Sequence, residues 1–162
     1  MKHPKSYDST PETRRRMSHV RLKRGKAETA LAKALWHAGC RYRLNDRRLP
    51  GSPDIAVTRY KLAIFVDGEF WHGYDWSRRK DRLKANRAYW IEKIEENIAR
   101  DRRNDARLQA MGWTPVHFWE KEVLKDLPGC VKTVEDLILQ RQVEEHLSSW
   151  EEPAGGCAGE EG

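Results

Sequence analysis

The amino-acid sequence predicts an α/β domain in which a small mixed β-sheet is flanked by helices. Apolar segments of strand length alternate with longer segments of helical periodicity, and residues that favour turns separate them. Helices that alternate with strands pack on the faces of the sheet. A chain of 162 residues can enclose one hydrophobic core but is too short for two domains and a linker.

The first expected helix spans 26–38, and Gly39 ends it. Three large apolar side chains recur at helical spacing within it, namely Leu31, Leu35 and Trp36. Residues 41–45 then alternate between polar and apolar side chains, as an edge strand does.

A β-hairpin is expected next, formed by segments 54–58 and 62–66 with 59–61 as the turn. The second of these segments is apolar enough to lie in the centre of the sheet. A long helix follows over 84–111, then a strand over 113–119 and an amphipathic helix over 131–146.

Charge divides the chain into three parts. Residues 1–26 hold nine Lys and Arg against two acids, a local charge of +7, whereas 151–162 hold four Glu and no base, a local charge of −4. We expect a basic arm over 1–26, one folded domain over 27–150 and a disordered acidic tail over 151–162. The bases of the arm that we expect to contact a polyanion are Arg14, Arg15, Arg16, Arg21, Lys23 and Arg24.

Composition favours a polyanion as the partner. The net charge is +6 and 35% of the residues are charged, which exceeds what solubility requires. No apolar run approaches the roughly 20 residues of a membrane span, and the first 26 residues lack the apolar core of a signal peptide. Three cysteines without a C-x-x-C pair indicate reduced thiols. We therefore expect a cytosolic protein with no membrane partner.

Two carboxylates fall on helix faces where apolar residues should pack. Glu28 shares a face with Leu31 and Leu35, and Asp101 continues a stripe that includes Ile98. Buried carboxylates are nearly always paired or metal-bound. Alternatively, both lie at the edge of the stripe and reach solvent or an arginine.

Acidic residues also mark the hairpin. Asp54 follows Pro53 at the start of one strand, and Val66-Asp67-Gly68-Glu69 ends the other. This arrangement can bring oxygen ligands together for a hard cation such as Mg²⁺. A Pro-Asp dipeptide also occurs in ordinary turns.

Two aromatics and a histidine, Phe70, Trp71 and His72, follow the central strand. Either the aromatics are buried and His72 caps the sheet, or the aromatics contact bases and a neutral His72 takes a proton from an attacking water. A basic run that includes Arg78, Arg79 and Lys80 adjoins this motif. Such runs are often solvated faces, but this position favours phosphate binding.

In this order, the motifs resemble those of the very-short-patch repair (Vsr) endonucleases. The match runs from about residue 10 to about residue 124, nearly without gaps. Its elements are Met17-Ser18-His19-Val20-Arg21, Glu28, Leu49-Pro50-Gly51-Ser52-Pro53-Asp54, Ile64-Phe65-Val66-Asp67-Gly68, Phe70-Trp71-His72-Gly73, Tyr89-Trp90-Ile91-Glu92-Lys93-Ile94, Asn97, Arg100-Asp101, Leu108, Gly112-Trp113 and Phe118-Trp119-Glu120.

The resemblance implies a PD-(D/E)XK nuclease fold and Mg²⁺-dependent cleavage of one strand of duplex DNA beside a thymine opposite guanine. It makes 27–150 the endonuclease domain and 1–26 its DNA-binding arm. Asp54 resembles the central Mg²⁺ ligand, and Val66 would contribute its backbone carbonyl. His72 resembles the general base, Glu28 would hold a metal-bound water, and Asp101 would orient a catalytic group.

The resemblance also assigns Met17, Phe70 and Trp71 to the residues that the family inserts into the base stack. Asp67 joins the catalytic candidates with its role open, and Glu69 either adds a metal ligand or points to solvent.

Many family members hold a structural zinc. The matching positions here are Glu69, Tyr74, Trp76 and Lys121, which lack the ligands that tetrahedral zinc prefers. We expect this chain to fold without zinc.

As partners, the resemblance implies mismatched double-stranded DNA and DNA-repair proteins, and we expect a monomer associated with the nucleoid of a prokaryote. Two rival functions stay open: a related nickase of a defence or restriction system with a different target, and a DNA-binding module without catalysis.

Overall fold

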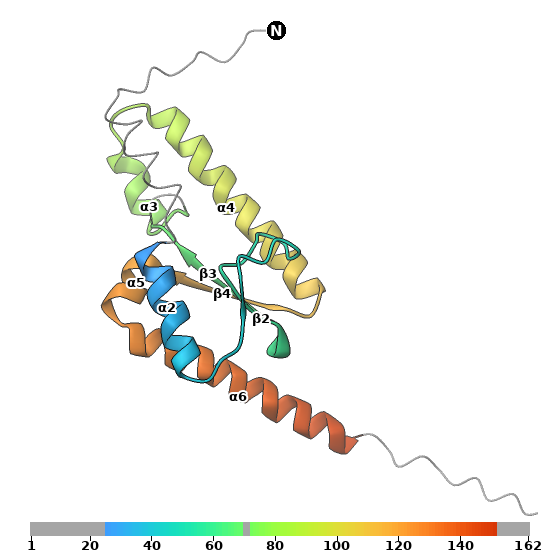
Figure 1. Cartoon of the computed structure of the whole chain (residues 1–162). Coiled ribbons are helices and arrows are strands. Elements are labelled where there is room, and N and C mark those ends of the chain that lie inside the picture. The colour runs from blue at the N-terminus through green and yellow to red at the C-terminus, as the bar shows by residue number, and fades with distance from the viewer. Residues whose placement is uncertain (1–24, 70–71, 152–162) are drawn as a thin grey trace, which may run out of the picture.

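Four strands form one mixed sheet in the structure, a computed structural model that describes residues 25–69 and 72–151 (Figure 1). In spatial order the strands are β1 (Arg43–Leu44), β2 (Ile55–Val57), β3 (Leu62–Asp67) and β4 (Thr114–Trp119). The first three pair antiparallel, and β3 pairs in parallel with β4. The predicted mixed sheet, its edge strand and its hairpin are confirmed.

Helices cover both faces of this sheet (Figure 1). One face packs against α2 (Lys26–His37), α5 (Glu120–Lys125) and α6 (Leu127–Glu151), and the other against α4 (Arg87–Ala110). Shorter elements lie in the connections: the 3₁₀ turns η1 (Thr58–Tyr60) and η2 (Lys80–Arg82), and the single turn α3 (Trp76–Arg79).

Alternation along β3 builds the two cores. Leu62 and Ile64 are fully buried against α2, α5 and α6, whereas Ala63 and Phe65 face the opposite side, where Leu108 of α4 covers them. Successive side chains of a strand point to opposite faces, so an almost continuous apolar strand indicates a sheet covered on both sides. The prediction of a central strand rested on this feature and is confirmed.

Some boundaries and contacts differ from the prediction. The long helix starts at Arg87, three residues later than expected, and α6 starts four residues earlier than expected. Trp36 does not join the core with its helical neighbours: it is 49% exposed, and the guanidinium of Arg41 stacks on its ring at 4.0 Å. Helical spacing places Trp36 at the edge of the apolar face, where its ring makes a cation–π contact with Arg41 instead of packing in the core.

Two further expectations bear on the class of protein. Cys40 and Cys130 are buried free thiols. No helix within the described part of the chain is long and apolar enough to cross a membrane.

Strand directions gather the acidic residues at one edge of the sheet. Because β2 runs antiparallel to β3, the start of β2 lies beside the end of β3. Because β4 runs parallel to β3, the second half of β4 reaches the same edge. Asp54, Asp67 and His117 are therefore neighbours although up to 63 positions separate them in the sequence.

Candidate active site

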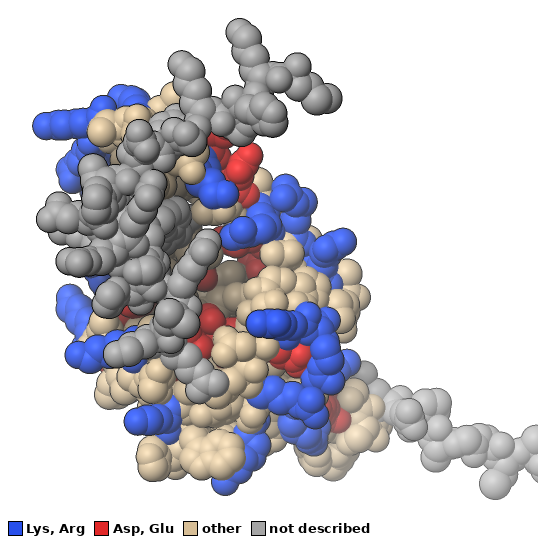
Figure 2. All heavy atoms as spheres, turned by 45° about the horizontal axis from the view of Figure 1, so that its top comes forward, with Lys and Arg blue, Asp and Glu red and all other residues tan. Residues whose placement is uncertain are grey.

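A pocket of about 310 Å³ opens at this edge, between β3, β4 and α4. Its walls carry three carboxylates and two imidazoles among short polar residues, and the lining residues are Gly51, Ser52, Phe65, Asp67, His72, Arg100, Asp101, Asn104, Asp105 and His117. Figure 2 shows acidic atoms in and beside a hollow of the surface, with Lys and Arg side chains projecting around it. Acidic side chains in the pocket can bind a cation, and the basic side chains around it can bind a polyanion.

Asp54 is held at the start of β2 by the backbone of the neighbouring strand. The Val66 N–H donates to Asp54 Oδ2 at 2.7 Å. Burial raises the pKa of the Asp54 carboxyl, the Val66 hydrogen bond opposes this rise, and the charge of Asp67 adds to it. The charge of Asp67 thus disfavours ionisation of Asp54.

His72 forms the second part of the site, together with α4. Its Nδ1 lies 2.6 Å from Oδ2 of Asp101 and 3.8 Å from Oδ1 of Asp67. The hydrogen bond to Asp101 raises the pKa of His72, and this outweighs the lowering that burial causes. Asp101, which lies on the apolar stripe of the helix, thus has a hydrogen-bonding partner in His72.

His117 belongs to this cluster, and sequence reasoning missed it. Its Nδ1 lies 2.7 Å from Oδ2 of Asp67, and its Nε2 lies 2.8 Å from Oδ1 of Asp105. Burial alone would lower the pKa of His117, but the hydrogen bonds to the two carboxylates raise it to about 9.

The sequence holds two signals that could have revealed this pair. A histidine stands in the middle of the β4 segment, and Asp105 follows Asp101 one turn later on the same helix stripe. Only the parallel register, which sets His117 beside Phe65, brings the two signals together. Strand register across a long crossover cannot be deduced from spacing in one sequence.

Three of the predicted acids, Asp54, Glu28 and Glu69, are not among the residues that line this pocket. Glu28, on the first turn of α2, is half-buried with its Oε1 excluded from solvent, but it does not line the pocket. Glu69 turns to the start of α5, where its Oε1 accepts a hydrogen bond from the Lys121 N–H at 2.7 Å. Its role there is to cap a helix start, an arrangement that suits a negative charge. This contact uses one oxygen of the carboxylate that was a candidate metal ligand.

The positions that the resemblance matched to zinc ligands make contacts of other kinds. Beside the contact between Glu69 and Lys121, Tyr74 packs edge-on against Trp119 with ring centroids 5.1 Å apart. No group of three or more His, Cys, Asp or Glu residues that could hold a metal occurs among residues 25–69 and 72–151. A cation at Asp54 would therefore depend partly on backbone, water or phosphate oxygens.

Basic residues after the His72 loop lie on α3 and η2. Arg78 is exposed, Arg79 lies 5.8 Å from the ring centre of Tyr74, and Lys80 pairs with Glu95 at 2.9 Å. The other residues predicted to bind DNA lie outside the described residues: Met17, Phe70, Trp71, Arg14, Arg15, Arg16, Arg21, Lys23 and Arg24.

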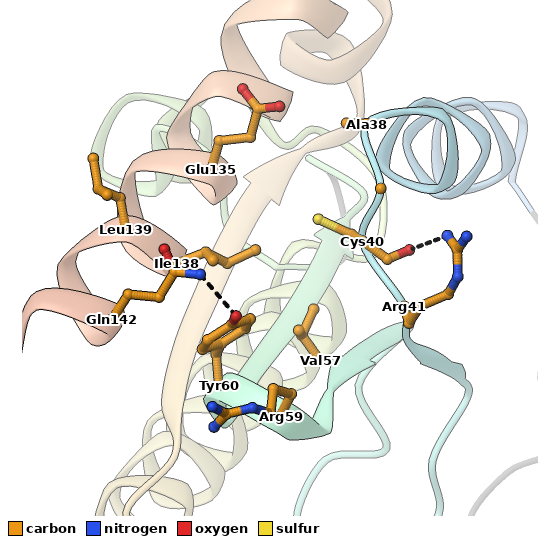
Figure 3. Close-up of a pocket in the computed structure, with 11 residues that line it drawn as sticks. Ala38, Cys40, Arg41, Val57, Arg59, Tyr60, Glu135, Ile138, Leu139 and Gln142 are labelled. Atoms are coloured by element: carbon orange, nitrogen blue, oxygen red, sulfur yellow. Dashed lines mark hydrogen bonds between the residues drawn. The ribbon is translucent and has the colours of Figure 1, made fainter. Parts of the chain in front are cut away.

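A second pocket, of about 390 Å³, lies on the other side of the sheet between α6 and the β2–η1 connection (Figure 3). It contains one carboxylate, Glu135, and no histidine, and Gln142 Nε2 donates to the hydroxyl of Tyr60 at 2.8 Å across its mouth. This side-chain set lacks an acid–imidazole pair, so the pocket at Asp67 is the candidate active site.

Comparison with known proteins points to one family. A family model described as "DNA mismatch endonuclease Vsr" matches residues 6–78. "Type II nicking enzyme V.NmeDIP" from Neisseria meningitidis serogroup C is 45% identical over 134 residues, which are 82% of this chain and 90% of the relative. "Type II nicking enzyme V.HpaIIP" from Haemophilus parainfluenzae is 45% identical over 136 residues, 83% of this chain and 96% of the relative. "DNA mismatch endonuclease Vsr" from Escherichia coli K12 is 35% identical over 124 residues, 76% of this chain and 72% of the relative.

Proposed function

Because this chain belongs to the Vsr family of DNA endonucleases, we propose that it is a Mg²⁺-dependent nickase that cuts one strand of duplex DNA beside a T:G mismatch. The observation that carries the proposal is the convergence of Asp54, Asp67 and the hydrogen-bonded pair His72–Asp101 at one edge of the sheet. In metal-assisted hydrolysis of a phosphodiester, carboxylates bind the metal ion and an oriented imidazole accepts a proton from the attacking water.

The residues at this edge fit a hard divalent cation. Burial and the charge of Asp67 both disfavour the ionised form of Asp54, and a bound cation would offset both effects. The Asp54 carboxylate and the Val66 carbonyl would hold the ion. Mg²⁺ commonly binds one or two protein carboxylates and keeps several water ligands. When bound, Mg²⁺ supplies Lewis-acid polarisation of the scissile phosphate and of a water.

The hydrogen bond of His72 to Asp101 supports a role for His72 as the general base. Nδ1 lies against the Asp101 carboxylate, which only accepts, so Nδ1 carries the hydrogen and the neutral ring has its lone pair on Nε2. A water near Nε2 can give a proton to this lone pair as its oxygen attacks phosphorus. The bond from phosphorus to one sugar oxygen then breaks, and that oxygen leaves and takes up a proton from solvent. Asp101 fixes the tautomer and stabilises the imidazolium that results.

Binding of the duplex is proposed to involve the basic arm over 1–26 and the bases Arg78, Arg79 and Lys80 on α3 and η2, which would contact phosphates. Met17, Phe70 and Trp71 would enter the base stack at the mismatch, where unstacking costs less because pairing is already faulty.

One experiment tests the reaction and its target together. The protein is incubated with Mg²⁺ and duplexes that contain one mismatch or none, and the nicks are mapped on both strands. Our proposal requires a nick on one strand that is much faster beside T:G than in fully paired DNA and that stops when the metal is chelated.

A second candidate function differs only in the target. Several relatives are named type II nicking enzymes, which favours a nickase that serves a restriction system and acts in another sequence context. Equal nicking of paired and T:G duplexes of one sequence would favour this candidate. Binding without nicking under every condition would favour a non-catalytic module.

A further inference from the structure

His117 occupies the centre of a chain of alternating carboxylates and imidazoles. Its ring lies between Asp105 on α4 and Asp67 at the end of β3, with nitrogen–oxygen distances of 2.8 Å and 2.7 Å. The other oxygen of Asp67, Oδ1, lies 3.8 Å from Nδ1 of His72. One side chain of β4 thus connects α4 to the group that flanks the proposed general base.

The partners of His117 define its protonation state. Both ring nitrogens face carboxylate oxygens, which accept hydrogen bonds but do not donate them. Both nitrogens therefore carry hydrogen, which makes the ring an imidazolium. The pKa of about 9 agrees with this assignment. Without a lone pair, His117 cannot take a proton from water, so it is not a second general base.

The position of the ring is fixed on several sides. His117 stands opposite Phe65 in the parallel pairing of β3 and β4, and the two rings stack at 4.7 Å with an angle of 10°. Asp67, in contrast, is only 8% exposed and lies close to the charge of Asp54. A buried carboxylate needs hydrogen-bond donors that hold it in one orientation, and His117 supplies one to Asp67.

We propose that His117 is a positioning residue of the nuclease site: anchored by Asp105, it holds the carboxylate of Asp67 beside the ring of His72. The proposal rests on the nuclease function proposed above. It gives Asp105 a role as well, because the hydrogen bond to Nε2 prevents the ring of His117 from turning away from Asp67.

Three substitutions at this position separate the two hydrogen bonds. The amide nitrogen of Asn lies near the place of Nδ1 of a histidine, and that of Gln lies near the place of Nε2. H117N therefore keeps a donor for Asp67, H117Q keeps a donor for Asp105, and H117F keeps only the ring that stacks on Phe65. His117 is about one-third exposed, so none of the three leaves a large cavity.

We expect the single-turnover nicking rate to fall about 10- to 100-fold in H117Q and H117F, as for other residues that orient a group at a metal site. H117N should retain most of the rate, and the KM for DNA should stay unchanged in all three. Equal losses in H117N and H117Q would overturn the proposal, because only the charge would then matter. Wild-type rates in H117Q would overturn it as well.

A control and a second readout separate this proposal from the function on which it rests. H146Q alters an exposed histidine on α6, away from the site, and should leave the nicking rate unchanged. Nitrogen NMR of the imidazole rings reports the geometry without any cleavage: the His72 signals should move in H117Q and stay in place in H117N. If they respond equally to both, His117 does not position Asp67, whatever the protein cuts. If no duplex is nicked while the NMR pattern holds, the proposed function fails and the positioning role stands.

Discussion

Asp54 carries a charge that its surroundings oppose. Burial and Asp67 raise the pKa of its carboxyl, and the Val66 N–H provides partial compensation. An amide oxygen can accept the same hydrogen bond, so D54N should keep the local structure while removing the charge that attracts the metal. We expect no nicking, an almost unchanged affinity for DNA, and a free energy of unfolding that is equal or higher by up to about 1 kcal/mol.

Nick mapping, DNA titration and thermal unfolding of the same variant test this expectation. D136N is a matched control, since Asp136 pairs with Lys132 on the surface and exposed pairs contribute roughly 0–1 kcal/mol. Nicking by D54N at the wild-type rate would contradict the assignment of the metal ligand.

The hydrogen bond between His72 and Asp101 predicts a specific pH dependence. Because this bond stabilises the imidazolium, the pKa of His72 is raised above its ordinary value, and the ring acts as a base only when it is neutral. The nicking rate should therefore increase as the pH rises and level off only above the raised pKa. In D101N the largest cause of the rise is removed, so the acid limb of the profile should move to lower pH while the maximal rate falls about 10- to 100-fold.

Rates measured between pH 5 and 10 on one T:G duplex check both parts, with Asp81 as the control position. D81N alters an exposed acid that pairs with Arg87 outside the pocket and should leave the profile in place. An acid limb that stays fixed in D101N would mean that another group titrates.

Single residues were predictable from the sequence where one element sufficed to identify them. Asp101 stood out because an acid on an apolar helix stripe needs a partner, and Asp54 because it opens a buried strand. His117 and Asp105 were missed because their contact depends on the register between β3 and β4, which the α4 crossover separates in the sequence. Glu69 had two open interpretations, and neither included its contact with the backbone of α5.

Among the secondary-structure elements, the loop between β3 and α3 depends on a contact with α5. Glu69 accepts the Lys121 N–H, and this bond ties the segment that carries His72 to the second residue of the helix. E69A should cost about 1 kcal/mol, as other losses of a helix cap do, and should lower the nicking rate because the His72 loop loses its attachment. E69Q keeps an acceptor oxygen and should behave as the wild type.

The comparison of E69Q with E69A distinguishes this capping role from the metal-ligand role that the sequence left open. Melting temperature, nicking rate and the Mg²⁺ concentration for half-maximal activity are measured for both. If E69Q needed much more Mg²⁺ while its melting temperature stayed normal, Glu69 would be a ligand after all.

The main elements followed from periodicity, and the short ones did not. β3 and α4 are long and strongly patterned, so their type and approximate bounds were predictable. α5, with six residues, is too short for its periodicity to be recognised, and part of the capping of its start comes from Glu69 on a distant segment of the chain. The length of the C-terminal helix was underestimated. Its second half exposes Leu139, Leu147 and Trp150, so no change from apolar to polar side chains marks where the helix ends.

For the whole molecule, the mixed sheet with helices on both faces confirms the predicted PD-(D/E)XK class. The division into arm, domain and tail stays a prediction, because most of the two charged ends lies outside the described residues. The net charge of +6 arises mostly from the first 26 residues. Composition therefore indicated the polyanionic partner, whereas the site that acts on it required the fold.

The basic arm gives the last prediction, which concerns the affinity of the whole protein for DNA. Each phosphate contact releases counterions, so the logarithm of the binding constant falls with the logarithm of salt concentration by roughly 0.9 per contact. Replacement of Arg14, Arg15 and Arg16 by Gln should reduce the steepness of this dependence by up to about 2.7 and weaken binding similarly to paired and mismatched duplexes. K132Q is the control, since Lys132 lies on α6 and pairs with Asp136. Binding titrations from low to high salt measure both slopes. An unchanged slope in the triple variant would mean that these arginines do not contact phosphates, and a loss confined to the T:G duplex would mean that they recognise the mismatch itself.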